Sequence, residues 1–271
     1  MSNAIRVKHG NFGRLAILDM SQSLVRHAHA EAHVLLKIGG GDAHFIVDGA
    51  AVPISDGEAV LVNSWEPHIC CVSKPREPLV ILALYVHPSW MAAQLSGRLS
   101  GARFATPSHS VSQSLRAKAK QFAERLMLSE LSNDDCKQAI LEVLDEIGGT
   151  VVTDGSVKSS SDRRITRCIA YMREHLDGRE DLSDIGSRFG LSRAHLFSLF
   201  RGCYGMTPHV YWNALRMQHA VDALNCREAN IGAIAAELGF SSQSNFTRFF
   251  QSNQGVGPRQ YRSAAMTGHA R

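Results

Sequence analysis

The sequence of 271 residues predicts an α+β chain of two domains: an N-terminal antiparallel β-barrel or jelly roll followed by two helices, and a C-terminal domain made of helices alone. Three observations lead to this prediction. Short β-rich runs separated by turn residues occupy the chain up to residue 86. Residues 148–162 are rich in glycine, serine and aspartate, as linkers are. The last third of the chain contains an internal repeat.

The N-terminal strands are marked by β-branched and aromatic residues between turn signals. The runs cover residues 15–19, 34–38, 43–47, 59–62, 69–72 and 79–86. Asp48-Gly49 separates two of the apolar segments and is a strong signal for a two-residue hairpin turn. Many short strands at this spacing predict a small antiparallel barrel or jelly roll.

Two helices are expected after the strands, near residues 111–128 and 134–147. Their apolar residues recur at helical spacing: Leu115, Phe122 and Leu126, then Ile140, Val143, Leu144 and Ile147. The predicted boundaries are therefore a first domain over residues 1–150, a linker over 151–162 and a second domain over 163–271.

The repeat consists of DIGSRFGLS at residues 184–192 and AIAAELGFS at residues 233–241. In each copy an apolar-periodic helix reaches a glycine, which can take the positive φ needed for a sharp turn. A serine then stands where an N-cap hydroxyl is needed for a second helix. Apolar residues four apart, Leu196 with Phe200 and Phe246 with Phe250, leave the other face of each second helix free. The repeat predicts two helix-turn-helix units.

A single long helix is predicted between the two units, over residues 208–224, with Pro208 at its start. It would hold the units at a fixed separation. From Asp162 onward the chain has 14 basic and 9 acidic residues, a net charge of +5, and every basic residue there is an arginine. Arginine suits bidentate contacts to phosphate and guanine, although a GC-rich genome also explains the bias.

Candidate DNA contacts follow from helix geometry. In the second unit the face opposite the buried phenylalanines carries Gln243, Ser244, Asn245 and Arg248, whose groups can read adenine and guanine edges. In the first unit the equivalent face carries Arg193, Ala194, His195, Ser198 and Arg201. Ala194 could touch only thymine methyls or sugars, so the second unit is the better candidate for reading bases. A solvated surface or a phosphate contact is the alternative at each position.

Residues from about 163 to 262 resemble the DNA-binding domain of AraC/XylS-type transcription regulators. The resemblance covers the first helix at 163–176, both helix-turn-helix units, the linker helix with Tyr211 and Leu215-Arg216, and the closing Pro258-Arg-Gln-Tyr-Arg262. It implies that the second helix of each unit lies in the major groove of promoter DNA. It also implies contact with RNA polymerase, usually as an activator, and a homodimer formed by the helices between residues 111 and 147.

Histidines are the chemically distinctive residues of the first domain. Residues two apart on a strand share a face, so His27 and His29 could converge with His33 and His68 and bind a divalent metal. The spacing of His27, His29 and His33, and of Gly57 and His68, resembles the two cupin motifs, with His33 in place of the usual glutamate.

The resemblance to sensory cupin domains implies a second use for this cavity, which is to hold a small-molecule effector without a required cofactor. Trp65 could stack on such an effector, although aromatic residues of small barrels are more often part of the core. Histidines that merely hydrogen-bond at the barrel mouth are a third interpretation. Alternation places Val34 and Leu36 in the core and gives His33 the opposite parity unless a bulge intervenes.

Several classes are disfavoured. The six cysteines have no Cys-x-x-Cys spacing, which argues against a zinc or redox site. The chain has no leader and no apolar run of membrane-spanning length, so a cytoplasmic protein without membrane contact is expected. We interpret the sequence as a dimeric, effector-controlled transcription regulator rather than an enzyme. The alternatives are a metal-dependent cupin enzyme fused to a DNA-binding module and, less favoured, an architectural DNA binder.

Overall fold

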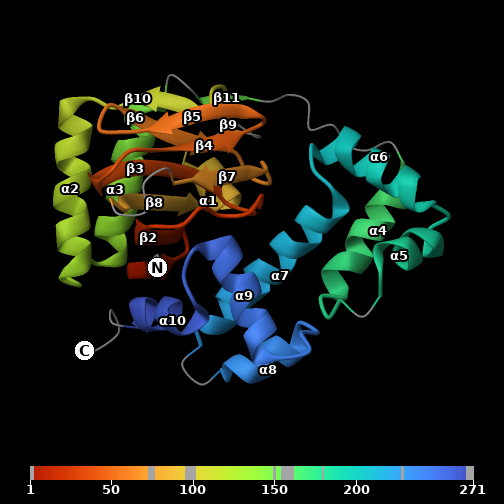
Figure 1. Cartoon of the computed structure of the whole chain (residues 1–271). Coiled ribbons are helices and arrows are strands. Elements are labelled where there is room, and N and C mark those ends of the chain that lie inside the picture. The colour runs from red at the N-terminus through yellow and green to blue at the C-terminus, as the bar shows by residue number, and fades with distance from the viewer. Residues whose placement is uncertain are drawn as a thin grey trace.

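The computed structural model describes residues 3–72, 77–94, 102–148, 151–153, 162–178, 180–226 and 229–266. The strands and two long helices form an N-terminal β domain, and seven described helices form a C-terminal helical domain beside it (Figure 1). Among the described residues, no helix combines the length and the apolar character needed to cross a bilayer.

Two antiparallel sheets of the β domain share one core, and a two-stranded sheet of β9 (Ala102–Phe104) and β11 (Val151–Thr153) lies beside them. The larger sheet has the order β1-β2-β8-β3-β6-β10, formed by Asn3–Gly10, Gly13–Met20, Leu79–Val86, Ala32–Gly40, Glu58–Val62 and Ser108–Ser110. The smaller sheet has the order β5-β4-β7, formed by Ala50–Ile54, Ala43–Val47 and His68–Cys71. Interior residues of both sheets belong to the same hydrophobic cluster. The α+β fold predicted from the sequence is confirmed, with the two sheets arranged as in a jelly roll.

The larger sheet is buried on both faces, and this resolves the parity of His33. On β3, Leu35 packs in the cluster between the sheets, whereas Val34 and Leu36 pack in a second cluster with the helices behind the sheet. His33 has the parity of Leu35 and pairs in regular register with Tyr85 of β8. The expectation that Val34 and Leu36 exclude His33 from the interior was therefore wrong, because the sheet has two cores and needs no bulge there.

Helices α2 (Gln113–Met127) and α3 (Asn133–Glu146) cover the outer face of the larger sheet. Each begins at a serine whose side chain accepts a backbone N–H, Ser112 for α2 and Ser132 for α3. Both helices lie within two residues of their predicted bounds. The short helix α1 (Pro88–Gln94) packs on the same cluster through Trp90 and Met91.

The predicted linker at 151–162 begins with a strand. Residues Val151–Thr153 form β11, which pairs with β9 (Ala102–Phe104) of the β domain. Residues 154–161 lie outside the described part of the chain. The helical domain begins at α4, whose N-cap is Asp162.

The helical domain consists of two groups of helices joined by α7. The helices are α4 (Arg163–Glu174), α5 (Leu182–Arg188), α6 (Arg193–Tyr204), α7 (Pro208–Leu224), α8 (Ile231–Glu237), α9 (Gln243–Gln254) and α10 (Pro258–Met266). The long helix predicted over residues 208–224 has these bounds. In Figure 1, α7 runs diagonally between α4–α6 on one side and α8–α10 on the other.

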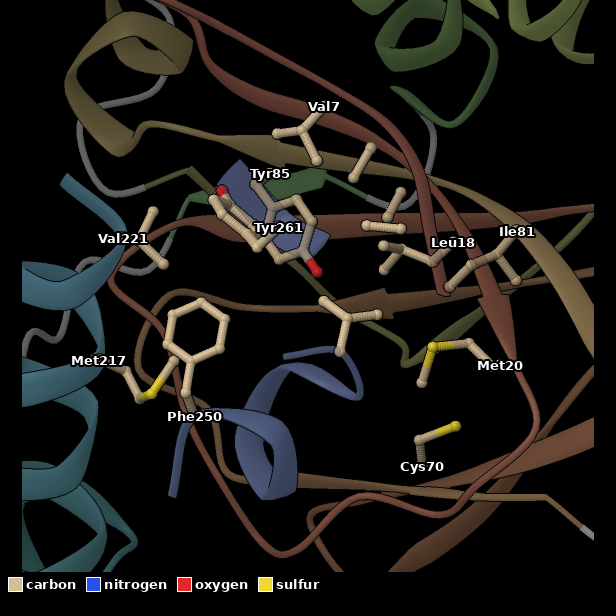
Figure 2. Close-up of a cluster of buried hydrophobic side chains, with 14 of the residues drawn as sticks. Val7, Leu18, Met20, Cys70, Ile81, Tyr85, Met217, Val221, Phe250 and Tyr261 are labelled. Atoms are coloured by element: carbon tan, nitrogen blue, oxygen red, sulfur yellow. The ribbon is translucent and has the colours of Figure 1, made fainter. Parts of the chain in front are cut away.

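The second group docks on the β domain. Helix α10 packs against β1, and Phe250 of α9 and Tyr261 of α10 belong to the same hydrophobic cluster as the interior of the β domain. Figure 2 shows Tyr85 of β8 beside Tyr261, with Phe250, Met217 and Val221 completing the contact from the helical side. The core of the β domain is therefore continuous with the core around the second helix-turn-helix unit.

Candidate nucleic-acid interface and histidine cluster

The first helix-turn-helix unit is formed by α5 and α6. The turn between them contains Gly190 at φ +70°, and Ser192 caps α6 by accepting the amide of His195 at 3.3 Å. Leu196 and Phe200 are fully buried, which fixes the rotation of α6 about its axis. All five predicted contact residues are exposed on the opposite face: Arg193, Ala194, His195, Ser198 and Arg201.

The second unit repeats this geometry with α8 and α9. Gly239 turns at φ +71°, and Ser242 accepts the amide of Asn245 at 3.2 Å. Phe246 and Phe250 are fully buried. Both units end in a left-handed glycine, Gly205 after α6 and Gly255 after α9. The internal repeat in the sequence is thus a repeat in the structure.

The predicted contact face of α9 is accessible to solvent, and two of its side chains are held in place by hydrogen bonds within the protein. Gln243, Ser244 and Arg248 are exposed, whereas Asn245 is half-buried. The amide of Asn245 donates to the Ser241 hydroxyl at 2.7 Å and accepts from the Arg248 guanidinium. These bonds hold the amide and the guanidinium side by side on one helix face.

Arg216 of the linker helix supports the second unit from inside. Its Nη2 donates to the carbonyl of Leu238 at 2.5 Å, and its guanidinium lies 4.3 Å from the centre of the Phe240 ring. The structure therefore gives Arg216 a role in holding the α8–α9 turn. Gly239 in that turn approaches the α4–α5 connection so closely that an added Cβ would lie 1.4 Å from the carbonyl oxygen of Asp177.

The four histidines converge inside the β domain. His27, His29, His33 and His68 are each at most 8% exposed, and the ring centres of His27 and His68 are 4.3 Å apart. His29 lies 4.5 Å from His33 and 4.8 Å from His27 by the same measure. One ligand atom from each of His27, His29 and His68 fits within a 4.8 Å range. The convergence of these side chains, which the sequence only suggested, is real.

Backbone carbonyls orient two of the four rings. Nδ1 of His27 donates to the carbonyl of Val25 at 2.7 Å, and Nδ1 of His68 donates to the carbonyl of Glu66 at 2.9 Å. Each ring therefore keeps its Nε2 lone pair free. The pKa values of all four imidazoles are lowered, chiefly by burial, to about 4 for His27 and well below the ordinary value for His29, His33 and His68. The cluster is neutral at physiological pH.

Very little space remains in the cavity beside these rings. His27, His33, His68 and Tyr85 line it from the β domain, together with six apolar side chains, and its free volume is about 20 Å³. That is the volume of a single water molecule or ion. The other wall is formed by Asn253 and Gln254, the last residues of α9. The end of the second candidate DNA-reading helix therefore closes the histidine cavity.

A buried polar contact also crosses between the domains. Nη1 of Arg14 on β2 donates to the hydroxyl of Tyr261 on α10 at 3.1 Å, and its guanidinium lies 3.7 Å from the centre of the Tyr85 ring. Tyr85 in turn lies 4.2 Å from His33, measured between ring centres. Sequence reasoning missed Arg14, Asn253, Gln254 and Tyr261, because nothing in the local pattern shows that β2 and β8 face the helical domain.

Trp65, predicted to line an effector site, lies outside the cavity. Its ring centre is 4.9 Å from that of Tyr211 on α7, and it packs against the cluster of the first helix-turn-helix unit. Its φ of +61° and the bond from its amide to the carbonyl of His29 at 2.6 Å turn the side chain outward. Trp65 is placed as a second contact between the two domains.

Comparisons with known proteins agree with this architecture. The family described as "Helix-turn-helix domain" matches residues 185–264, from α5 to α10. The regulator ExsA of Pseudomonas aeruginosa is 31% identical over 106 residues, which are 39% of this chain and 38% of ExsA. The transcriptional activator RhaS of Shigella sonnei is 23% identical over 246 residues, 86% of each chain. The chain spans 32–38% of the length of those relatives that it matches through this domain alone.

The whole fold resembles a solved structure. ToxT of Vibrio cholerae strain SCE256, solved with an unsaturated fatty acid bound, superposes with a TM-score of 0.57 at 14% identity, covering 100% of this chain and 97% of ToxT. Two helix-turn-helix units on one linker helix, docked on an N-terminal sheet domain, define the class of two-domain helix-turn-helix regulators. The chain contains an AraC-type helix-turn-helix domain, as the resemblance in its sequence implied, and regulators are among its relatives.

Proposed function

We propose that this protein is a sequence-specific DNA-binding transcription regulator whose two reading helices are α6 and α9. The observation that carries the proposal is the exposure of equivalent polar faces on two structurally repeated helices joined by α7. A continuous helix of 17 residues is about 25 Å long and holds the two faces at a set distance. Promoter DNA is the partner that this arrangement fits, with base readout chiefly by Gln243, Asn245 and Arg248.

The same proposal includes control by a small effector in the β domain. The β domain and the second unit share one core, so a change in the β domain reaches α9 and α10 through direct packing. ToxT has been solved with an unsaturated fatty acid bound, which supports effector binding by this fold. An effector shifts the regulator only if it binds one arrangement of the two domains better than another.

We further propose a cytoplasmic homodimer that activates transcription through RNA polymerase, as the name of RhaS supports for an activator. The dimer contact is assigned to the side of the β domain that carries α2, which faces away from the helical domain (Figure 1). Three of the exposed large apolar side chains support this assignment: Ile5, Met127 and Leu128.

Regulation is favoured over catalysis. The matched relatives are named as regulators, and a cavity of about 20 Å³ has no room for an organic substrate beside the histidines. A metal-dependent enzyme would need an open coordination position that substrate can reach.

The test is selection of DNA from a random-sequence library by the full-length chain, followed by fluorescence anisotropy with the selected and a scrambled duplex. We expect the selected duplex to bind at least about 1,000-fold more tightly at the same salt concentration. Equal affinity for the two duplexes would refute sequence-specific regulation. Sedimentation of the protein with and without DNA tests the dimer, with Leu128→Glu as the disrupting variant and Lys120→Glu, exposed on the same helix, as its control.

A further inference from the structure

The histidine cluster has the chemistry of a transition-metal site. Four neutral imidazoles from three segments of the chain lie together in the buried interior. Buried polar groups need hydrogen-bond partners or another compensating interaction. Nε2 of His33 is buried and has no hydrogen-bond partner. A buried imidazole nitrogen without a hydrogen-bond partner can coordinate a transition metal.

The orientation of the rings supports the same conclusion. Carbonyls of Val25 and Glu66 accept the Nδ1 protons of His27 and His68, which leaves both Nε2 atoms as ligands. Hydrogen bonds from the second ring nitrogen to a backbone carbonyl orient histidines in metal sites. The absence of a carboxylate from the four residues and their nitrogen-only character favour Zn²⁺, Co²⁺ or Ni²⁺ over Mg²⁺ or Ca²⁺.

The distances require a small closure of the site. Ligand atoms of His27, His29 and His68 lie within 4.8 Å of one another. Tetrahedral zinc with bonds of about 2.0–2.1 Å places its ligand nitrogens about 3.3 Å apart. Binding would therefore draw the rings inward by roughly 1 Å, and the free volume of about 20 Å³ is enough for an ion but not for an organic effector.

The ligands are connected to α9 by two hydrogen bonds in series. His27 donates to the carbonyl of Val25, and the amide of Val25 donates to the carbonyl of Ser252 near the end of α9 at 3.2 Å. Asn253 and Gln254, the next two residues, close the cavity. Drawing His27 inward would tighten the segment around Val25 against α9 and stabilise the docked position of the second unit.

The docked position brings the β domain close to the predicted reading face. Gln22, Ser23 and Val25 share a surface groove with Arg248 of α9. A DNA backbone that follows α9 would have to pass this segment. Tighter docking should therefore oppose DNA binding by the second unit.

From these observations we propose that His27, His29 and His68 bind one divalent transition-metal ion in the cavity that His33 also lines, and that this ion is the effector, which locks α9 onto the β domain and weakens DNA binding. The inference rests on the proposed function, because it names the effector of the same regulator. The metal site and the DNA response are measured separately, so that one can fail without the other.

The experiment uses full-length protein without a polyhistidine tag, stripped with a chelator and then dialysed. Titration with Co²⁺ should give one ion per chain, with visible absorption bands of a nitrogen site and without the near-ultraviolet thiolate band that a cysteine ligand would add. Zn²⁺ should displace the cobalt and raise the Tm by about 5 °C or more. Lack of binding, or a thiolate band, would overturn the site.

Variants test the assignment of the ligands. His29→Ala/His68→Ala should lose Co²⁺ binding, whereas His87→Ala, which removes an exposed histidine of the same domain, should keep it. Circular dichroism and sedimentation check that each variant is folded. If the double variant does not fold, the cobalt stoichiometry and spectrum of the unaltered chain still decide the question. Retained binding by a folded double variant would place the ion elsewhere and refute the proposal.

The DNA response is measured with a duplex selected by the metal-free protein. Saturating Zn²⁺ should weaken its binding at least fivefold and slow hydrogen exchange at the amide of Val25. Unchanged or tighter DNA binding with a filled site would refute the effector role. Absence of sequence-specific binding by the metal-free protein would refute the proposed function instead, and would leave the metal site standing on its cobalt data.

Discussion

Arg14 of β2 and Tyr261 of α10 form a buried hydrogen bond, 3.1 Å from Nη1 to the hydroxyl, between residues that are 247 positions apart in the chain. Burial raises the pKa of Tyr261 to about 12, so its hydroxyl keeps its proton and can donate a hydrogen bond to Nε2 of His9 at 3.0 Å. Together with the stacking of Arg14 on Tyr85, this bond makes the β domain and the second helix-turn-helix unit one packed body.

The first prediction concerns that contact. Tyr261→Phe leaves the buried guanidinium of Arg14 without its acceptor and should lower the free energy of unfolding by about 1–3 kcal/mol. Urea denaturation followed by circular dichroism measures the loss. Tyr171→Phe is the matched control, because its hydroxyl bonds to Glu180 near the surface, where water can replace it. Equal losses of unfolding free energy in both variants would show that the Arg14 contact stabilises the protein no more than a hydrogen bond near the surface does.

The second prediction concerns base readout by α9. Arg248→Ala should weaken binding to the selected duplex by about 1–3 kcal/mol and relax the preference at one base position, since a bidentate guanine contact is lost. Binding to non-specific DNA should change much less. Anisotropy at one salt concentration measures both, with Lys120→Ala on α2 as the control. A loss of the same size on specific and non-specific DNA would reassign Arg248 to a phosphate contact.

The third prediction separates crowding from backbone strain. Gly239 and Gly190 hold equivalent turns at φ +71° and +70°, but an added Cβ would lie 1.4 Å from the Asp177 carbonyl at Gly239 and meets nothing within 4 Å at Gly190. Gly190→Ala should cost about 1–2 kcal/mol of stability from the left-handed backbone alone. Gly239→Ala should cost distinctly more and also reduce DNA affinity, because the two units must move apart. Similar stability of the two variants would contradict the close approach at Asp177.

The fourth prediction is a loss of stability in mild acid. The buried histidines have folded pKa values below the unfolded value near 6.5, lowered by burial and, for His29 and His33, also by neighbouring histidines and Arg14. The unfolded chain therefore takes up protons first as the pH falls. The stability that depends on neutral histidines is complete above about pH 6.5 and declines as the pH falls toward 4.

Urea midpoints between pH 5 and 7.5, measured in chelator, test this prediction. Each histidine that stays neutral in the folded protein adds a slope of up to about 1.4 kcal/mol per pH unit. His33→Leu should lower the slope of stability against pH by the contribution of one histidine, up to about 1.4 kcal/mol per pH unit, whatever the variant does to absolute stability. The exposed His87→Ala should leave the slope unchanged. A flat profile in this window would mean that the cluster is not neutral in the folded state.

The two helix-turn-helix units were predictable from the sequence because their determinants are local. A glycine at positive φ, a serine cap and two aromatic or aliphatic residues four apart specify each turn, and the structure has all of them at Gly190, Ser192, Leu196 and Phe200. The linker helix and the strands at 43–47 and 79–86 were predicted with their observed bounds for the same reason. Strands β1, β9, β10 and β11 were not predicted, because they are short or edge strands whose pairing depends on distant partners.

The sequence by itself determined the AraC-type domain, the repeat of helices α6 and α9 and the four histidines, since each depends on spacing within a few dozen residues. Only the tertiary structure decided that the sheet is buried on both faces, which sends His33 inward, and that Trp65 turns away toward Tyr211. It alone placed Asn253, Gln254 and Tyr261 against the β domain. The contacts of Asn253, Gln254 and Tyr261 with the β domain join segments more than 150 residues apart. No local propensity encodes which distant surface will exclude water from an arginine, a tyrosine or a cluster of imidazoles.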